Sequence, residues 1–427
     1  MGTSITGYAA YVPAYRLGRD SGARSRRVVA SFDENSTTMA VAAARNLPVD
    51  ALAADPDLWF ATTSPAYLDK TNATAIHAAL GLAPSALATD AAGSSRSTVG
   101  ALRGAAATGG LVVAADVRVG RPGSADERLG GDAAAALVFG DGPAIADIVA
   151  HAHSTAEFLD TWRPPSATVA AHWEERFGYE QYVALIDDAV PRALAQAGVS
   201  SADHAVVVSP NSAIVKRAGS LVPAAQGVVS PVGYSGAADL LLGLADVLDR
   251  AEPDQTVLLV SAADGCDVWV LRTTAALVDR RQPVPVARQL DGGIEVPYPV
   301  YLSWRGLLDR EPPRRPEPAS SVADAQRGLR LRRQAERSPT SDQACGCPAS
   351  AAGAACPVPG RSRGAPSTRP SAWVTMRPRW VGNASACTSG LGRVPMVQTT
   401  VALASGSPSS SSTPLACTRA TLARQRT

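Results

Sequence analysis

The sequence has little cysteine in its first three quarters. Six cysteines occur in 427 residues, and only Cys266 precedes residue 340. A disulfide framework needs paired cysteines, so a small disulfide-stabilised fold is excluded. Lysine is almost absent, since Lys70 and Lys216 are the only two, and the net charge is only +2. Proteins that bind nucleic acid carry a strong excess of positive charge, so we expect no nucleic-acid partner.

Long apolar runs are missing as well. The N-terminal stretch MGTSITGYAAYVPAYRLGRD has no basic start followed by an apolar core, so we expect no signal peptide. No uninterrupted apolar run approaches the roughly 20 residues that a membrane-spanning helix needs. The hydrophobic content of 46% is nevertheless enough for a packed core. We therefore expect a globular protein of the cytoplasm that does not enter the membrane.

The most informative segment is residues 90–116, DAAGSSRSTVGALRGAAATGGLVVAAD. A Gly-Ser-Ser cluster at 93–95 precedes a run of helix-forming residues. A Gly-Gly pair at 109–110 then precedes an apolar run that ends at Asp116. This order predicts a turn, a helix, a second turn and a buried strand. The first amide groups of a helix are unpaired and favour negative charge, and α/β enzymes place a nucleophile at such a position. Ser95 occupies it here.

A second segment repeats this pattern about 140 residues later. Residues 233–238, GYSGAA, precede a leucine-rich helix, and residues 256–262 form another apolar run before Asp264 and Gly265. Two copies of one pattern predict a duplicated half-domain. Around them, strand patterns alternate with helix patterns, which favours parallel strands and a layered α/β fold. The remaining strands are expected at 4–8, 58–62, 133–140, 144–151 and 205–208 and within 284–302, and the remaining helices at 33–48, 71–80, 179–198 and 213–219.

The composition divides the chain into four parts. Residues 1–150 and 151–310 form the two similar halves, and 311–340 is a linker rich in proline and arginine. The tail at 341–427 has no acidic residue after Asp342, and from there it also lacks lysine, isoleucine, phenylalanine and tyrosine. Such a segment cannot bury enough apolar area to offset its chain entropy. Disorder and translation in a shifted reading frame both explain the tail, and the shifted frame is the favoured hypothesis.

Several short motifs, in this order and at this spacing, together point to one family. Besides segment 90–116 they are Gly7-Tyr8 with Tyr11-Val12-Pro13, Asp33-Glu34 with Thr38-Met39-Ala40, Ala114-Ala115-Asp116-Val117-Arg118, Gly131-Asp132-Ala133-Ala134-Ala135, Ser209-Pro210-Asn211 with Lys216-Arg217-Ala218, Gly233 with Ser235-Gly236-Ala237-Ala238, and Asp264-Gly265. Over residues 4 to about 315 the sequence resembles the thiolase superfamily. Within it, the sequence is similar to the bacterial and archaeal 3-hydroxy-3-methylglutaryl-CoA synthase-like proteins, relatives of ketoacyl-ACP synthase III.

The resemblance implies a fold, a ligand and partners. The fold is the five-layered αβαβα arrangement of two similar halves, and the protein is a homodimer. The substrate or ligand is an acyl-CoA thioester, with no covalently bound cofactor. Some relatives continue through a proline-rich linker into a zinc ribbon and an OB-fold, so a partner of that type is implied too. The tail itself does not match a zinc ribbon, because Cys345, Cys347 and Cys356 lack paired C-x2-C spacing.

The catalytic positions of the family hold other residues in this chain. Family members use a cysteine thiolate assisted by a histidine, an asparagine and, in the synthases, a glutamate. By the resemblance, the nucleophile position falls on Ser95, the histidine on Val208, the asparagine on Tyr234 and the glutamate on Thr63. A serine attacks a thioester only if a base takes its proton. His204 precedes Val208 by four residues on one strand, roughly 13 Å away, and is therefore not placed to do so.

Two residues are nevertheless candidates for catalysis, Ser95 and Tyr234. A phenol can donate or accept a proton, so Tyr234 fits a general acid or base as well as a space-filling aromatic. Three functions stay open: an acyltransferase with an altered site, a tyrosine-dependent retro-aldolase on CoA thioesters, and an inactive subunit that binds acyl-CoA or stabilises a partner.

The remaining site residues follow from the same motifs. Asn211, Lys216 and Arg217 are the expected CoA-binding residues, because a family motif runs through them and cationic side chains bind phosphate. His151 and His153 share one face of an expected strand, but a lone pair of histidines is weak evidence for a metal, and we expect none.

Overall fold

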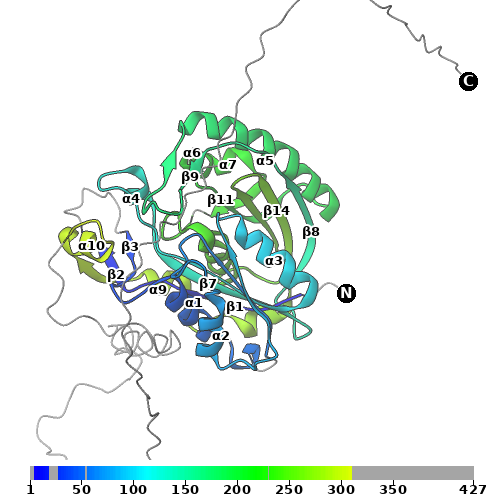
Figure 1. The fold of residues 1–427 in the computed structure, drawn as a ribbon. Coiled ribbons are helices and arrows are strands. Elements are labelled where there is room, and N and C mark those ends of the chain that lie inside the picture. Colours follow the sequence, from blue (N-terminus) through cyan, green and yellow to red (C-terminus); the bar gives the residue numbers. More distant parts are fainter. Residues whose placement is uncertain (1–3, 19–26, 53–54, 229, 310–427) are drawn as a thin grey trace, which may run out of the picture. The chain divides into compact units, whose positions relative to one another are not determined.

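The computed structural model describes residues 4–18, 27–52, 55–228 and 230–309 (Figure 1). Helices and strands alternate along this part of the chain, as the predicted α/β class requires. The predicted linker at 311–340 and the tail at 341–427 lie outside the described residues.

The first half of the chain forms one set of strands. Their order is β5 (Ala88–Ala92), β4 (Leu58–Thr62), β6 (Gly110–Asp116), β7 (Ala133–Gly140) and β1 (Ser4–Tyr11). Strand β4 runs parallel to β5 and β6, whereas β7 is antiparallel to β6 and β1. All of β6 and all but the last residue of β7 are buried, which is expected of strands covered on both faces.

The second half repeats this arrangement strand for strand. Its order is β12 (Ala224–Val228), β11 (Ala202–Val208), β13 (Thr256–Ala262), β14 (Cys266–Thr273) and β8 (Ala146–Ser154). Strand β11 is parallel to β12 and β13, and β14 is antiparallel to β13 and β8. A pairing of Ile5 with Ala146 joins β1 to β8. The matching order confirms the predicted duplication, while the boundary near residue 150 stays a prediction.

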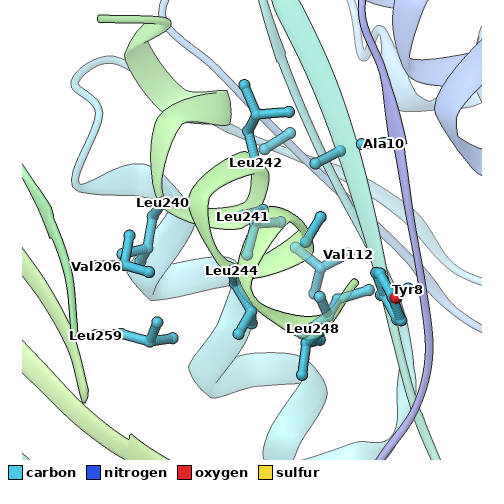
Figure 2. Close-up of a cluster of buried hydrophobic side chains, with 14 of the residues drawn as sticks. Tyr8, Ala10, Val112, Val206, Leu240, Leu241, Leu242, Leu244, Leu248 and Leu259 are labelled. Atoms are coloured by element: carbon cyan, nitrogen blue, oxygen red, sulfur yellow. The ribbon is translucent and has the colours of Figure 1, made fainter. Parts of the chain in front are cut away.

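Two helices form the layer between the two sets of strands. Helices α3 (Ser97–Thr108) and α8 (Asp239–Leu248) share one hydrophobic core with side chains from both halves. Figure 2 shows the leucines of α8 in this core, among side chains of the second half (Val206 and Leu259) and of the first half (Tyr8, Ala10 and Val112). Burial of one leucine contributes roughly 1.5–3 kcal/mol. The leucine-rich segment that marked the repeat in the sequence is therefore α8, and it lies in the core between the two sets of strands.

The outer faces of the strands are covered by further helices. Helices α1 (Ser36–Arg45) and α2 (Ala73–Leu80) pack on the first set, in a core that includes Met39, Phe60 and Leu111. Helix α5 (Glu175–Ala197) packs on the second set with α6 (Ser212–Lys216) and α7 (Ala218–Leu221), and it continues through Pro191. The order helix, strand, helix, strand, helix confirms the five-layered αβαβα prediction.

Short elements complete the described chain. They are β2 (Tyr15–Leu17), β3 (Val28–Val29), η2 (Val49–Leu52), α4 (Ala125–Leu129), β9 (Thr161–Trp162), β10 (Ala171–His172), η3 (Gly236–Ala238), η4 (Ala275–Arg280), α9 (Val286–Leu290), β15 (Ile294–Val296) and α10 (Tyr298–Trp304). The expectation of strand within 284–302 holds only for the three residues of β15. Helices α9 and α10 form on either side of β15. Pro285 and Pro297 precede them, and the fixed φ of proline suits the start of a helix. Within the described ranges, no helix is both long enough and apolar enough to cross a membrane.

A glycine lets each central helix approach its own sheet closely. A Cβ on Gly104 of α3 would lie 2.8 Å from the Trp59 ring, and one on Gly243 of α8 would lie 2.5 Å from Val206 Cγ1. Trp59 is on β4 and Val206 on β11, which hold the same place in their halves. Each glycine also follows its candidate site residue, Ser95 or Tyr234, by nine positions. The two helix entrances therefore correspond position by position.

The substitution Gly243→Ala tests this close approach. The added methyl group must displace β-branched Val206, so we expect a loss of about 1–3 kcal/mol in the free energy of unfolding, measured by urea denaturation. Gly100→Ala on α3 is the control, since no atom lies within 4 Å of the position that its Cβ would take. The control should be neutral or stabilising by up to about 1 kcal/mol. Equal effects of the two substitutions would contradict the close packing of α8.

Candidate functional site

A buried carboxylate lies where the two halves of the chain meet. Asp116 ends β6 and is fully buried, and its oxygens accept six hydrogen bonds of 2.7–3.0 Å. Five come from Thr62, Thr63 and Ser64, at the end of the neighbouring parallel strand β4. The sixth comes from the backbone N–H of Ala237, in the second half. The six donors replace the water that this charge has lost.

Gly236 is what allows the second half to reach Asp116. Its φ is +62°, and a Cβ at this position would lie 2.0 Å from Asp116 Oδ2. Glycine is required on both counts. Beside it, Thr98 Oγ1 of α3 donates to the carbonyl of Ala237 at 2.6 Å. The entrance of α3 is thus tied directly to η3, which leads into α8.

Tyr234 stands at the entrance of the second central helix. Its backbone N–H donates to the Leu129 carbonyl at 2.8 Å, and its carbonyl accepts from the Gly131 N–H at 3.1 Å. Burial raises the pKa of Tyr234 to about 12, although the positive charge of Arg118 and a hydrogen bond with the Ser95 side chain oppose this rise. The phenol is therefore protonated at neutral pH, and it acts as a hydrogen-bond donor rather than as a base.

The structure thus brings Ser95 and Tyr234 together. Ser95 lies two residues before α3, and its carbonyl accepts from the N–H of Thr98. Among the described residues, the histidine side chains contact other groups: His77 the carbonyl of Ala83, His151 the ring of Trp269, His153 the guanidinium of Arg103, His172 the carboxylate of Asp126, and His204 the amide oxygen of Gln255. These contacts leave Ser95 with a phenol as its neighbour and no imidazole to take its proton.

Cys266, the cysteine in the described residues, lacks the properties of a nucleophile. Cys266 begins β14 and is fully buried in the core beneath α5. Burial raises the pKa of the Cys266 thiol to about 12, so the thiolate form is absent at neutral pH. In the part of the chain that the structure describes, no three His, Cys, Asp or Glu side chains are grouped as a metal site would require.

Arg118 is a site residue that the sequence analysis did not select. It follows the strand β6 by two residues, and its guanidinium carbon lies 4.9 Å from the centre of the Tyr234 ring. Its Nη1 donates to Thr63 Oγ1 at 3.1 Å. Parallel strands bring polar residues at their carboxyl ends to one edge of a sheet. That rule, applied to the ends of β4 and β6, is the signal that could have found Arg118.

Asp239 is a second site residue that the sequence analysis did not select. It is the first residue of α8 and is buried, and it accepts a hydrogen bond from Ser235 Oγ at 3.2 Å. Burial raises the pKa of Asp239 to about 6, against the opposing effect of hydrogen bonds from Ser230 and Ser235. Nothing in its spacing distinguishes it from an ordinary acidic residue in the first turn of a helix.

A hairpin of the second half is tied to the first half beside the site. Strands β9 and β10 pair in this hairpin, and Arg163 donates to the carbonyl of Thr63 at 2.6 Å. His172 Nε2 lies 2.6 Å from Asp126 Oδ2. The hydrogen bond and negative charge of Asp126 raise the pKa of His172, although burial opposes the rise. Burial alone would raise the pKa of Asp126, but the hydrogen bond and charge of His172 outweigh it and lower that pKa.

The three expected CoA-binding residues lie around α6. Asn211 caps α6 through the N–H of Ala213, and its side-chain amide donates to the carbonyl of Glu175 at 2.9 Å. Lys216 is exposed and donates to Ser212 Oγ at 2.8 Å, while the guanidinium of Arg217 stacks over Tyr179. Asn211 is thus engaged within the protein, whereas Lys216 faces solvent. Their role in CoA binding stays a prediction.

Curated proteins similar in sequence to this chain share one description. No family model matches the chain. A hydroxymethylglutaryl-CoA synthase of Aeropyrum pernix is 30% identical over 342 residues, covering 71% of this chain and 94% of the relative. The corresponding enzyme of Archaeoglobus fulgidus is 28% identical over 337 residues, covering 70% and 98%.

Solved structures show the same likeness in the fold. An HMG-CoA synthase complexed with CoA superposes with a TM-score of 0.61 at 15% identity, covering 70% of this chain and 89% of that one. The 3-oxoacyl-(acyl carrier protein) synthase III of Pseudomonas aeruginosa gives 0.56 at 21% identity, covering 64% and 99%.

The substitution Asp116→Asn tests the junction of the two halves. Asparagine has an NH2 group in place of one carboxylate oxygen. That group cannot accept the hydrogen bonds that the surrounding N–H and O–H groups now donate to Asp116. We expect a loss of about 3 kcal/mol or more in the free energy of unfolding, because buried donors are left unsatisfied. Asp141→Asn, at an exposed turn, is the control and should stay within about 0.5 kcal/mol of the wild type. A neutral Asp116→Asn would show that these hydrogen bonds do not hold the junction.

The pair of His172 and Asp126 predicts a pH dependence of stability. The raised pKa of His172 means that its stabilisation is fully present below 6.5 and is lost as the pH rises through the raised value. The lowered pKa of Asp126 means that the pair is also lost as the pH falls through that lowered value. Wild type and His172→Gln should therefore differ most at about pH 5–6, by about 0.5 kcal/mol for this half-exposed pair, and should converge in alkali.

A double-mutant cycle separates this pair from other effects of the substitutions. Asp126→Asn should cost about as much stability as His172→Gln, and the double variant should cost little more than either. Additive losses, or a difference that does not change between about pH 5.5 and pH 9, would refute the pair as the cause.

Proposed function

The chain belongs to the hydroxymethylglutaryl-CoA synthase family, and on that premise we propose that it binds an acyl-CoA thioester with the acyl end beside Ser95 and Tyr234 and forms no acyl-enzyme there. The observation that carries this proposal is that the Ser95 side chain lies close to the protonated phenol of Tyr234, at the entrances of the two central helices. Two neutral donors polarise a thioester carbonyl, but neither attacks it.

In the proposed site, the residues at the family's catalytic positions are neither strong nucleophiles nor bases. Ser95 takes the nucleophile position, Val208 the histidine, Tyr234 the asparagine and Thr63 the glutamate. Thr63 donates to Asp116 at 2.7 Å and accepts from Arg118, so it has a structural partner on each side. Val208 ends β11 as a buried apolar residue. This set can hold a ligand and orient it, and it lacks the thiolate and the base of a condensing enzyme.

The ligand follows from the relatives. One structural neighbour was solved with CoA and another with 3-hydroxy-3-methylglutaryl coenzyme A. The proposed CoA contacts are Lys216 and Arg217, whose positive charges suit phosphate, with Asn211 shaping the loop before them. No covalently held cofactor is part of the proposal.

The proposed assembly is a homodimer in the cytoplasm. Strand β5 stands at the end of the strand order in the described sheet, with β4 on its inner side. Its sequence Ala-Thr-Asp-Ala-Ala has small side chains, which suits close pairing with the same strand of a second copy. A partner with a zinc ribbon and an OB-fold remains a proposal from the resemblance.

A second candidate function is a retro-aldol cleavage that uses Tyr234. In that reaction the β-hydroxyl group gives its proton to solvent water, because this set of residues supplies no base. The bond between the α and β carbons breaks, a carbonyl forms at the β carbon, and the electron pair moves to the thioester enolate. The enolate then takes up a proton from water at its α carbon. A protonated Tyr234 beside Ser95 fits the donor that stabilises the enolate oxygen. Cleavage of a β-hydroxyacyl-CoA that disappears in Tyr234→Phe would support this candidate.

Incubation with acetyl-CoA tests the proposed function. We expect acetyl-CoA to bind in calorimetry and the intact mass of the protein to stay unchanged. Ser95→Cys should bind equally well and gain an acetyl group, because a thiol with a pKa near 8.5 supplies some thiolate without a base. An acetyl adduct on Ser95 of the wild type would refute the absence of an acyl-enzyme. No detectable binding of acetyl-CoA or CoA would refute the proposed function itself.

A further inference from the structure

The side chain of Arg96, the neighbour of Ser95 in the chain, reaches into the second half. Its Nε donates to Asp267 Oδ2 at 2.7 Å, and its Nη1 donates to the carbonyl of Asp264 at 2.6 Å. Its Nη2 donates to Thr155 Oγ1 at 2.8 Å. The three acceptors lie on β14, on the turn between β13 and β14, and directly after β8. One side chain of the first half is therefore held by three segments of the second half.

The Asp264-Gly265 motif, to which the proposed function gives no role, forms part of this contact. Asp264 has a φ of +50° and Gly265 a φ of +144°, so the chain turns sharply here. A Cβ on Gly265 would lie 2.7 Å from the guanidinium carbon of Arg96 and 2.6 Å from the carbonyl oxygen of Ser154. Glycine is required both for the backbone conformation and for the room that the guanidinium occupies. The motif is thus shaped to receive Arg96.

The ion pair of Arg96 with Asp267 is largely shielded from water. The side chain of Asp267 is 6% exposed and that of Arg96 is 21% exposed. Two hydrogen bonds join the groups, because Nη2 of the guanidinium also donates to Asp267 Oδ1 at 3.3 Å. A guanidinium and a carboxylate that are joined in this bidentate way have a defined mutual geometry. The Arg96 side chain therefore has little freedom, and it restrains the backbone beside Ser95.

The turn that carries Ser95 depends on such a restraint. Its residues Gly93 and Ser94 are exposed, and the φ of Gly93 is +135°. The Gly93 N–H donates to the carbonyl of Thr62 at 3.3 Å, and the N–H of Arg96 donates to Ser94 Oγ at 3.3 Å. Both distances are long for hydrogen bonds of this type. The three contacts of the Arg96 side chain are shorter, and they lead to the half of the chain that also carries the phenol of the site.

Resting on the proposed function, we propose that Arg96 is a positioning residue that sets the place of Ser95 opposite Tyr234. It acts through Ser95 and not on the ligand. The contact of Asp116 with Ala237 is its counterpart, since there a charged side chain of the first half holds the segment that follows Tyr234. In both contacts, a charged side chain that crosses between the halves fixes one of the two helix entrances.

The variant Ser95→Cys supplies a readout for this position. Its thiolate attacks the carbonyl carbon of bound acetyl-CoA, the bond from that carbon to the CoA sulfur breaks, and CoA leaves as a thiolate that takes up a proton. The rate of acetylation at saturating acetyl-CoA is measured by intact mass from about pH 6 to about pH 10, across the ionisation of the thiol. The rate at high pH reports the position of the sulfur, and the midpoint of the profile reports its pKa.

The variants at the contact are made in the Ser95→Cys background. Arg96→Gln should lower the high-pH rate by about 100-fold, as a displacement of about 1 Å can do. Asp267→Asn should also lower the rate, and the two changes together should cost little more than Arg96→Gln, because both act through one contact. Arg96→Lys keeps the charge without the planar fork and should restore part of the rate. Arg103→Gln, at an exposed position of α3, is the control and should leave the rate unchanged. All variants should bind free CoA equally well in calorimetry.

Several results would overturn the inference. One is an unchanged high-pH rate in an Arg96→Gln variant whose thermal midpoint shows it to be folded, and another is a profile in which only the midpoint moves. A loss of affinity for free CoA would assign Arg96 to ligand binding instead. If Arg96→Gln does not fold, the same criteria apply to Asp267→Asn and Arg96→Lys.

Two further results separate this inference from the proposed function. Bound acetyl-CoA that never acetylates Ser95→Cys would place residue 95 away from the thioester, and it would overturn the inference while the binding of acyl-CoA stands. Failure of the wild type to bind acetyl-CoA or CoA would overturn the proposed function and this inference with it.

Discussion

The carboxylate of Asp116 is the interaction on which the arrangement of the site depends. It collects donors from the end of β4 and from η3, which are segments of different halves separated by more than a hundred residues. Because Ala237 is fixed to it, Tyr234 is fixed as well, only three residues away along the chain. Because Thr63 is fixed to it, Arg118 has a hydrogen-bond acceptor that orients its guanidinium. A group that touches no ligand thus positions residues of the candidate site.

The fold could be predicted from the sequence because its duplication is written in local patterns. Glycine and serine before each central helix, leucines along α8 and apolar runs after each helix are all short-range features, and the structure and the relatives confirm the thiolase-like family and the five layers. The motifs that carried the resemblance lie on these same segments. The prediction of strand within 284–302 is confirmed for β15 alone. The valines and tyrosines there suit strand and helix alike, and the prolines that precede α9 and α10 favour a helix in those two segments.

The site was predictable only in part. Ser95 and Tyr234 were found because the resemblance places them at positions that the family uses, and the structure brings their side chains close together. Their catalytic roles stay predictions. Arg118 was not found because its partner, the ring of Tyr234, comes from the other half of the chain. Asp239 was not found because burial distinguishes it, and its spacing in the sequence does not record burial. A sequence pattern records which residues are present, whereas such contacts exist only after the halves have packed.

The matched glycines at 104 and 243 have a consequence for the origin of the site. They make Ser95 and Tyr234 counterparts, so an ancestor of half the length that assembled as a pair would have placed the same amino acid at both entrances. A single chain that carries both halves has no such obligation, since each entrance can change while the other stays constant. The hydroxyl of Ser95 and the phenol of Tyr234 are the two different groups that the single chain sets at these equivalent entrances.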